Sequence, residues 1–164
     1  MKKRDLPLFL AAAGILACSR EREPERIPVA FFNDLAVYDA YSPAAPLNDV
    51  TSVYFRVVNT GSQPDTLKTV SIAVGTAHLH EVVTENDLTR MQPVESLPVP
   101  AKGELRLLPG GYHIMLSHMG AGIRVGDTIR VELEFARAGS HTIPVAVLTY
   151  TEVLERLGTR NDRR

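Results

Sequence analysis

Cysteine is almost absent from this sequence of 164 residues, and tryptophan is entirely absent. With Cys18 as the only cysteine, no internal disulfide can form. An excess of positive charge is also lacking, because 18 Lys and Arg stand against 19 Asp and Glu. This balance offers no electrostatic basis for nucleic-acid binding, and we expect none. The H-E-x-x-H, G-x-S-x-G and glycine-rich phosphate-loop motifs are missing, so we predict that the protein is not an enzyme.

No hydrophobic run reaches the length of about 20 residues that a membrane-spanning helix needs. The run Leu6–Ala17 follows a basic segment at residues 2–4, a pattern typical of a signal peptide. It ends in Ile15-Leu16-Ala17-Cys18, which resembles the lipobox of bacterial lipoproteins. The resemblance implies cleavage before Cys18 and lipidation of this residue. The alternative is an ordinary signal peptide followed by an incidental cysteine.

Composition divides the chain into four segments. Residues 1–17 are the expected signal peptide, and residues 18–29 are the expected lipidated cysteine and flexible tether, because they are charged and poor in apolar side chains. Residues 30–151 are long enough for one domain with a hydrophobic core. Residues 152–164 form a polar, basic tail, for which a short helix and disorder are both compatible with the sequence.

Short apolar segments separated by turn residues predict a β-rich domain. In Thr51–Asn59, for example, Val53, Phe55 and Val57 alternate with residues that face the other way. The expected strands are 35–41, 51–59, 67–74, 77–83, 104–108, 112–117, a long strand opened by Gly126-Asp127, and 142–149. This spacing predicts an all-β fold, either a sandwich or a small Greek-key barrel.

Four residues carry the strongest chemical signal: His80, Met91, His113 and Met115. Their spacing, H-x10-M-x21-H-x-M, resembles the signature of the PCuAC family of periplasmic copper chaperones. The flanking blocks His80-Glu81, Arg90-Met91-Gln92-Pro93-Val94 and Gly111-Tyr112-His113-Ile114-Met115-Leu116 are also similar to that family, and the resemblance covers residues 37–147. It implies a cupredoxin-like β-barrel that binds copper(I) through these four side chains.

The donor set suits that ion on chemical grounds. Copper(I) is soft and prefers thioether and imidazole ligands, whereas two thioethers suit zinc poorly. His113 and Met115 are two apart on an expected strand, so both point to one face. We expect His80 near a strand end and Met91 in a loop after a turn. A blue-copper electron carrier would need a cysteine ligand, and Cys18 belongs to the signal region.

The remaining histidines and methionines are weaker candidates. His78 shares the strand face of His80 and is either a spare ligand or a surface residue. His118 and Met119 follow the motif and could form an auxiliary site, whereas we expect His141 to be structural. Taken singly, a methionine or histidine is more often a packing or surface residue than a ligand.

The resemblance implies a metallochaperone of the cell envelope that faces the periplasm and is held by its lipid anchor alone. It implies a recipient such as the copper centre of cytochrome c oxidase, with a Sco-type protein as co-chaperone. Ser19, in place of the Asp that retains many lipoproteins at the inner membrane, favours the outer membrane. Two alternatives stay open: an envelope interaction module without metal, and a copper storage or detoxification protein.

Overall fold

A computed structural model describes residues 26–73 and 75–158 of the chain. The expected signal peptide, the expected lipidation site Cys18, the first part of the tether and the last residues of the tail lie outside the described residues. Among the residues that are described, no helix has both the length and the apolar character needed to cross a membrane.

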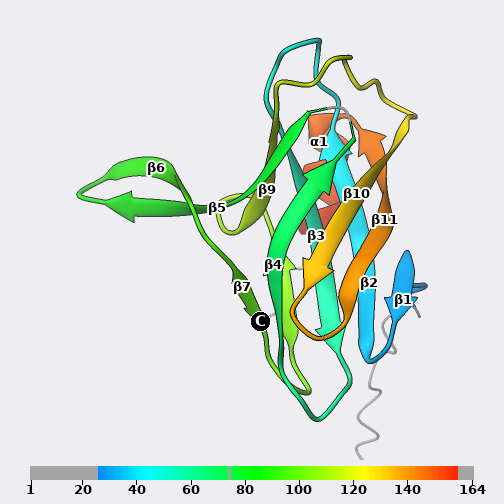
Figure 1. Cartoon of the computed structure of the whole chain (residues 1–164). Helices are drawn as coiled ribbons and strands as arrows, with labels where there is room; N and C mark the ends of the chain where they lie inside the picture. The colour runs from blue at the N-terminus through cyan, green and yellow to red at the C-terminus, as the bar shows by residue number, and fades with distance from the viewer. Residues whose placement is uncertain (1–25, 74, 159–164) are drawn as a thin grey trace, which may run out of the picture.

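The described residues form eleven strands and one helix, which confirms the all-β prediction (Figure 1). Their bounds are β1 (Ala30–Phe32), β2 (Leu35–Pro43), β3 (Thr51–Asn59), β4 (Asp65–Ile72), β5 (Thr76–Glu85), β6 (Leu88–Pro93), β7 (Leu97–Val99), β8 (Glu104–Leu107), β9 (His113–Ser117), β10 (Thr128–Phe135), β11 (Gly139–Leu148) and α1 (Tyr150–Gly158).

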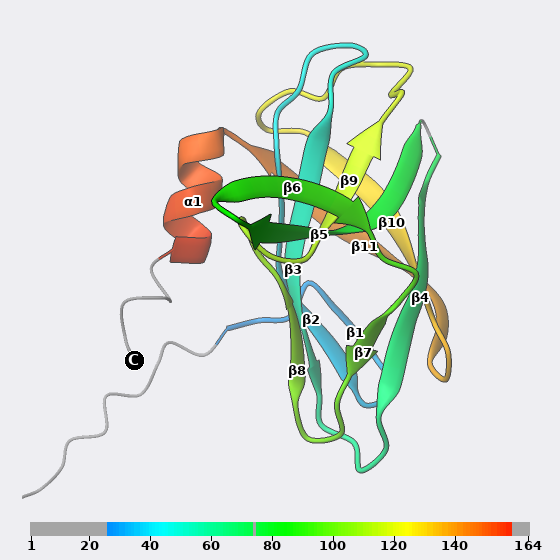
Figure 2. The same ribbon diagram turned by 90° about the vertical axis from the view of Figure 1, so that its left-hand side faces the viewer.

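All the strands belong to one open sheet whose hydrogen-bonded order is β6-β5-β9-β3-β2-β11-β10-β4-β7, with β1 added to β2 and β8 to β3. Neighbouring strands pair antiparallel except β11 and β2, which run parallel. Figure 2 shows the sheet curling on itself. Strands from both parts of the sheet contribute to a single large core, which includes Phe55 and Ile114 from β3 and β9 and Leu133 and Phe135 from β10. The two path-end strands, β6 and β7, are not paired with each other, so the barrel is not closed.

The prediction that Met91 lies in a loop is wrong, because Met91 belongs to strand β6. The polar turn expected at Glu85-Asn86-Asp87 is a two-residue hairpin turn in which Asn86 and Asp87 both have positive φ (50° and 63°). Such a turn matches the twist of the flanking strands and returns the chain directly into pairing. The β5–β6 hairpin projects from the body of the molecule (Figure 1). His80 is correspondingly in the middle of β5 rather than near its end.

Helix α1 begins at a capping box. The Thr149 hydroxyl accepts a hydrogen bond from the Glu152 amide at 3.2 Å, and the Glu152 carboxylate accepts one from the Thr149 amide at 2.9 Å. The helix lies beside the sheet (Figure 2) and packs through Val153 and Leu157 against Tyr54 of β3. The first residues of the predicted tail are therefore helical and docked on the sheet.

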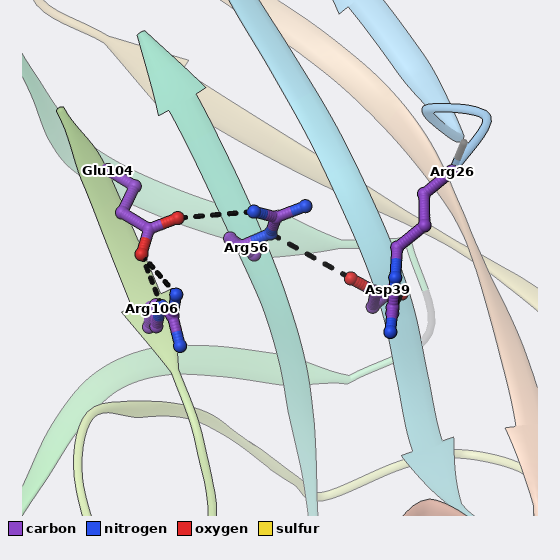
Figure 3. A network of polar contacts seen from close by, with 5 residues as sticks. All are labelled: Arg26, Asp39, Arg56, Glu104 and Arg106. Atoms are coloured by element: carbon purple, nitrogen blue, oxygen red, sulfur yellow. Dashed lines mark hydrogen bonds and ion pairs between the residues drawn. The ribbon is translucent and has the colours of Figure 1, made fainter. Parts of the chain in front are cut away.

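A polar network occupies the same outer face next to the helix (Figure 3). Arg56 on β3 pairs with Glu104 on β8 at 3.2 Å and with Asp39 on β2 at 3.9 Å. Arg26 binds Asp39 from the other side at 3.0 Å, and Arg106 pairs with Glu104. Burial raises the pKa of Asp39, and the two neighbouring guanidinium groups oppose that rise. The network ties β2, β3 and β8 to the first described residue of the tether.

Candidate metal centre

The centre of the site is a pair of histidines on neighbouring antiparallel strands. His80 on β5 lies directly opposite His113 on β9 in the register, so both side chains point to the outer face of the sheet. Their ring centroids are 5.8 Å apart and the rings are inclined by 24°. Two imidazoles that share one metal ion can have centroids up to about 6.4 Å apart, given metal–nitrogen bonds of about 2 Å. The pair is therefore spaced to hold one ion.

A tight turn presents His113 at the start of β9. Gly110 has a φ of 81°, which favours glycine, and the Gly111 amide donates to the Leu108 carbonyl at 3.0 Å. The Gly111 carbonyl lies 3.1 Å from Nδ1 of His113. Because a carbonyl can only accept, Nδ1 carries the proton, and Nε2 is left as the ligand atom. The His78 carbonyl fixes His80 in the same way through Nδ1, at 3.3 Å.

Nε2 of His113 is buried and has no hydrogen-bond partner among the residues that the structure describes. Such an atom costs about 1–3 kcal/mol when left without a partner, so its retention calls for an explanation. Burial lowers the pKa of His113 below its ordinary value, and positive charge on His80 lowers it further, against the raising effect of the Gly111 carbonyl. The ring is therefore neutral at pH 7, which is the form that binds metals.

Met115 joins the histidine pair from the same strand. It lies two residues after His113 and so shares its face, half-buried between Ser52 on β3 and His78 on β5, its register partners. The intervening residue, Ile114, points the other way into the core. The predicted shared face of His113 and Met115 is thus confirmed.

Met91 lies at the rim of this group. Its register partner is Val82, two residues from His80 on the same face of β5, so Met91 is the diagonal neighbour of His80. Diagonal positions are about 7–8 Å apart, within reach of a long side chain. The Met91 side chain is 62% exposed. The structure therefore brings His80, His113 and Met115 together and leaves Met91 beside them, open to solvent.

Of the weaker candidates, His78 lies beside His80 on β5, whereas the other three lie apart from the site. Met119 is fully buried in the core, where its thioether serves packing. His118 is exposed, and its Nδ1 lies 3.2 Å from the Ser117 hydroxyl. His141 stacks on Phe32 at 4.0 Å and contacts the Ala138 carbonyl through Nε2 at 2.8 Å, as a structural histidine does.

Tyr54 is a site neighbour that sequence reasoning missed. Its ring centroid is 6.5 Å from that of His113, and its other side is covered by α1. Alternation alone placed Tyr54 on the outer, solvent-facing side of β3, but the helix buries it to 8% exposure. Burial raises the pKa of its phenol. The docked helix and Tyr54 thus form an apolar wall on the β3 side of the histidine pair.

The arrangement offers nitrogen and sulfur donors without charge. In the described parts of the chain, no three His, Cys, Asp or Glu side chains gather closely enough to hold a metal ion. The thioethers of Met115 and Met91 are therefore available as further donors for a site built on His80 and His113. A neutral N2S2 set suits a soft monovalent ion and offers nothing to the hard cations that prefer oxygen.

The chain is similar to known proteins in sequence and in fold. Residues 35–147 match the family described as "LpqE-like: Putative lipoprotein LpqE-like". The curated "Putative lipoprotein Lxx21020" of Leifsonia xyli subsp. xyli is 39% identical over 100 residues, which is 60% of this chain and 59% of that protein. The chain thus matches less than two thirds of that relative's length.

Solved structures share the fold. The copper-bound PCuAC domain from PmoF2 matches with a TM-score of 0.62 at 22% identity, over 73% of this chain and 97% of that one. The copper(I) form of DR1885 from Deinococcus radiodurans matches with a TM-score of 0.55 at 22% identity, over 77% of this chain and 82% of that one. At these identities the likeness establishes the fold, and it confirms the cupredoxin-like class expected from the sequence resemblance.

Proposed function

The chain belongs to the family of LpqE-like lipoproteins, and from this premise we propose that it is an envelope lipoprotein that carries copper(I). Copper(I) is the cargo, and His80, His113, Met115 and Met91 are its ligands. Cys18 is the point of lipid attachment, so that residues 18–29 tether the domain to the membrane on its periplasmic side, with Ser19 favouring the outer membrane. The role is one of binding and transfer, without catalysis.

The observation that carries the proposal is the unpartnered Nε2 of His113. Its lone pair is buried, its tautomer is fixed by the Gly111 carbonyl, and it belongs to a ring that lies 5.8 Å from His80. A buried polar atom without a partner weakens the fold. Its presence is explained if a bound ligand supplies the missing partner. Bound metal would satisfy this atom, and the backbone carbonyls of Gly111 and His78 would hold both rings in orientation.

The choice of copper(I) rests on the donors. A metal centre with two thioethers selects soft ions, and copper(I) is the soft ion to which imidazole and thioether are both suited. The structural neighbours from PmoF2 and Deinococcus radiodurans are described as copper-bound and copper(I)-bound respectively, which supports the same cargo here.

Transfer would begin at Met91. Because its side chain is 62% exposed while those of His80 and His113 are buried, an incoming ligand of a recipient meets Met91 first. Replacing one thioether at a time keeps copper coordinated throughout the exchange. The recipient that we propose is a copper-accepting protein, such as cytochrome c oxidase at its copper centre or a Sco-type thiol protein.

The test is an anaerobic copper(I) titration of the full chain, in a Cys18→Ala background, against a competing chelator. Removing the thiol is necessary because a free thiolate binds copper(I) itself. Met91→Leu and Met115→Leu remove sulfur at nearly constant volume and so spare the packing. Leu88→Ala, an exposed apolar residue of the same strand as Met91, is the matched control.

We expect one equivalent of copper(I) in the parent and in Leu88→Ala. Each methionine variant should bind at least tenfold more weakly, which corresponds to about 1.4 kcal/mol. A folded parent that binds no copper(I) would refute the carrier function and leave an interaction module. Tight binding that no recipient domain can remove would instead indicate storage.

A further inference from the structure

His78 is a third imidazole beside the proposed copper(I) ligands. It precedes His80 by two residues on β5, so the two side chains share one face of the strand. Its register partner across the sheet is Met115, just as that of His80 is His113. The four side chains therefore occupy the corners of a rectangle on two adjacent strands. Met91 lies outside this rectangle, on the far side of β5.

The position of His78 allows it to share an ion with His80. Their ring centroids are 6.5 Å apart and the rings meet edge to face, at 78°. The upper limit for two imidazoles on one ion is about 6.4 Å, so the His78 ring lies just outside the distance at which it could share an ion with His80. The side chain is exposed, and a rotation about its own bonds would bring it within reach without any movement of the strand.

Copper(I) and copper(II) differ in the ligands that they prefer. Copper(I) accepts thioethers, whereas copper(II) prefers nitrogen donors in a tetragonal arrangement. With His80 and His113 alone, copper(II) would have two nitrogen ligands and depend on sulfur for the rest. With His78 it would have three imidazoles, and Met115 could serve as a weak additional ligand from the opposite corner.

From this juxtaposition, and resting on the proposed copper function, we propose that His78 replaces Met91 as a ligand when the site holds copper(II). The protein then binds copper in both oxidation states on the shared ligands His80 and His113. Met91 discriminates in favour of copper(I), and His78 discriminates in favour of copper(II). A carrier built this way retains its cargo in an oxidising compartment.

The experiment measures both affinities on the full chain in the Cys18→Ala background. Copper(II) is titrated against glycine as competitor, and the bound form is examined by electron paramagnetic resonance for nitrogen couplings. Copper(I) is titrated anaerobically as above. The variants are His78→Ala and Met91→Leu, with His118→Ala as the control, because His118 is another exposed histidine close to the same strands.

We expect His78→Ala to lower copper(II) affinity at least tenfold, to reduce the number of coupled nitrogens by one, and to leave copper(I) affinity within about threefold. Met91→Leu should lower copper(I) affinity and spare copper(II), and His118→Ala should change neither. A His78→Ala protein with unchanged copper(II) affinity and spectrum overturns the proposal, as does a parent that binds no copper(II). Failure of the parent to bind copper(I) overturns the carrier function separately, since the copper(II) measurements stand without it.

Discussion

Replacing His113 by leucine should make the copper-free protein more stable. The substitution removes the buried Nε2 that has no partner among the described residues, which relieves about 1–3 kcal/mol. It also removes the hydrogen bond from Nδ1 to the Gly111 carbonyl, at a cost of about 0.5–1.5 kcal/mol. That carbonyl still accepts from the Val82 amide at 3.3 Å, so no new unsatisfied group arises. The net expectation is a gain of about 1 kcal/mol.

The same substitution at His141 should have the opposite sign. His141 stacks on Phe32 with centroids 4.0 Å apart and contacts the Ala138 carbonyl at 2.8 Å. Leucine forfeits the stacking and the hydrogen bond and relieves nothing, for a loss of about 1–2 kcal/mol. The two histidines are thus a matched pair, in which one serves the site and the other serves the fold.

The assay is urea unfolding of the copper-free protein with a chelator present, followed by circular dichroism because the chain has no tryptophan. A pH of about 7.5 keeps histidine neutral in both the folded and the unfolded state, so that proton uptake does not enter. If His113→Leu destabilises the protein as much as His141→Leu does, then His113 is a structural residue. Its unpartnered nitrogen would then not weaken the copper-free fold.

Three further outcomes follow from the structure. Burial lowers the pKa of His113, so as the pH falls the unfolded chain takes up this proton before the folded protein does. The contribution of His113 to the free energy of unfolding of the copper-free protein should be complete above pH 6.5 and be lost as the pH falls through the folded-state pKa. In urea titrations at several pH values, His113→Leu should lack this pH dependence. Leu157→Ala removes three buried carbons from beneath α1 and should lower the free energy of unfolding by about 2–3 kcal/mol. The control Leu154→Ala, at a half-exposed position of the same helix, should lower it by less than about 0.5 kcal/mol. Equal losses in urea unfolding would show that the helix is not docked as described. Asp65→Ala should lower the free energy of unfolding by about 3 kcal/mol in the same assay, because the Asp65 carboxylate accepts hydrogen bonds from the backbone amides of Thr66, Arg137 and Ala138. An unchanged free energy of unfolding would contradict those hydrogen bonds.

Much of the fold was accessible from alternation. Thr51–Asn59 was predicted with the observed bounds, because a strand with one face in the core must alternate strictly. Strand β6 was missed because Leu88–Pro93 has no buried residue and belongs to a projecting hairpin, where nothing enforces alternation. The turn signal at Asn86-Asp87 was present, and a two-residue turn would have predicted the returning strand.

The site was only partly predictable, for a similar reason. The shared face of His113 and Met115 follows from the period of a strand, but the pairing of His80 with His113 depends on a register between β5 and β9 that no local pattern specifies. The burial of Tyr54 depends on a helix whose buried residues are Val153 and Leu157, too few to stand out in a polar tail. Spacing identified the residues, and only the sheet showed how they meet.

X-ray absorption at the copper edge on the anaerobically copper(I)-loaded protein tests the central claim most directly. We expect two nitrogen ligands at about 2.0 Å from the copper and two sulfur ligands at about 2.3 Å, with only one sulfur left in Met91→Leu and in Met115→Leu. A shell of nitrogen and oxygen alone, or one that neither methionine variant changes, would contradict it.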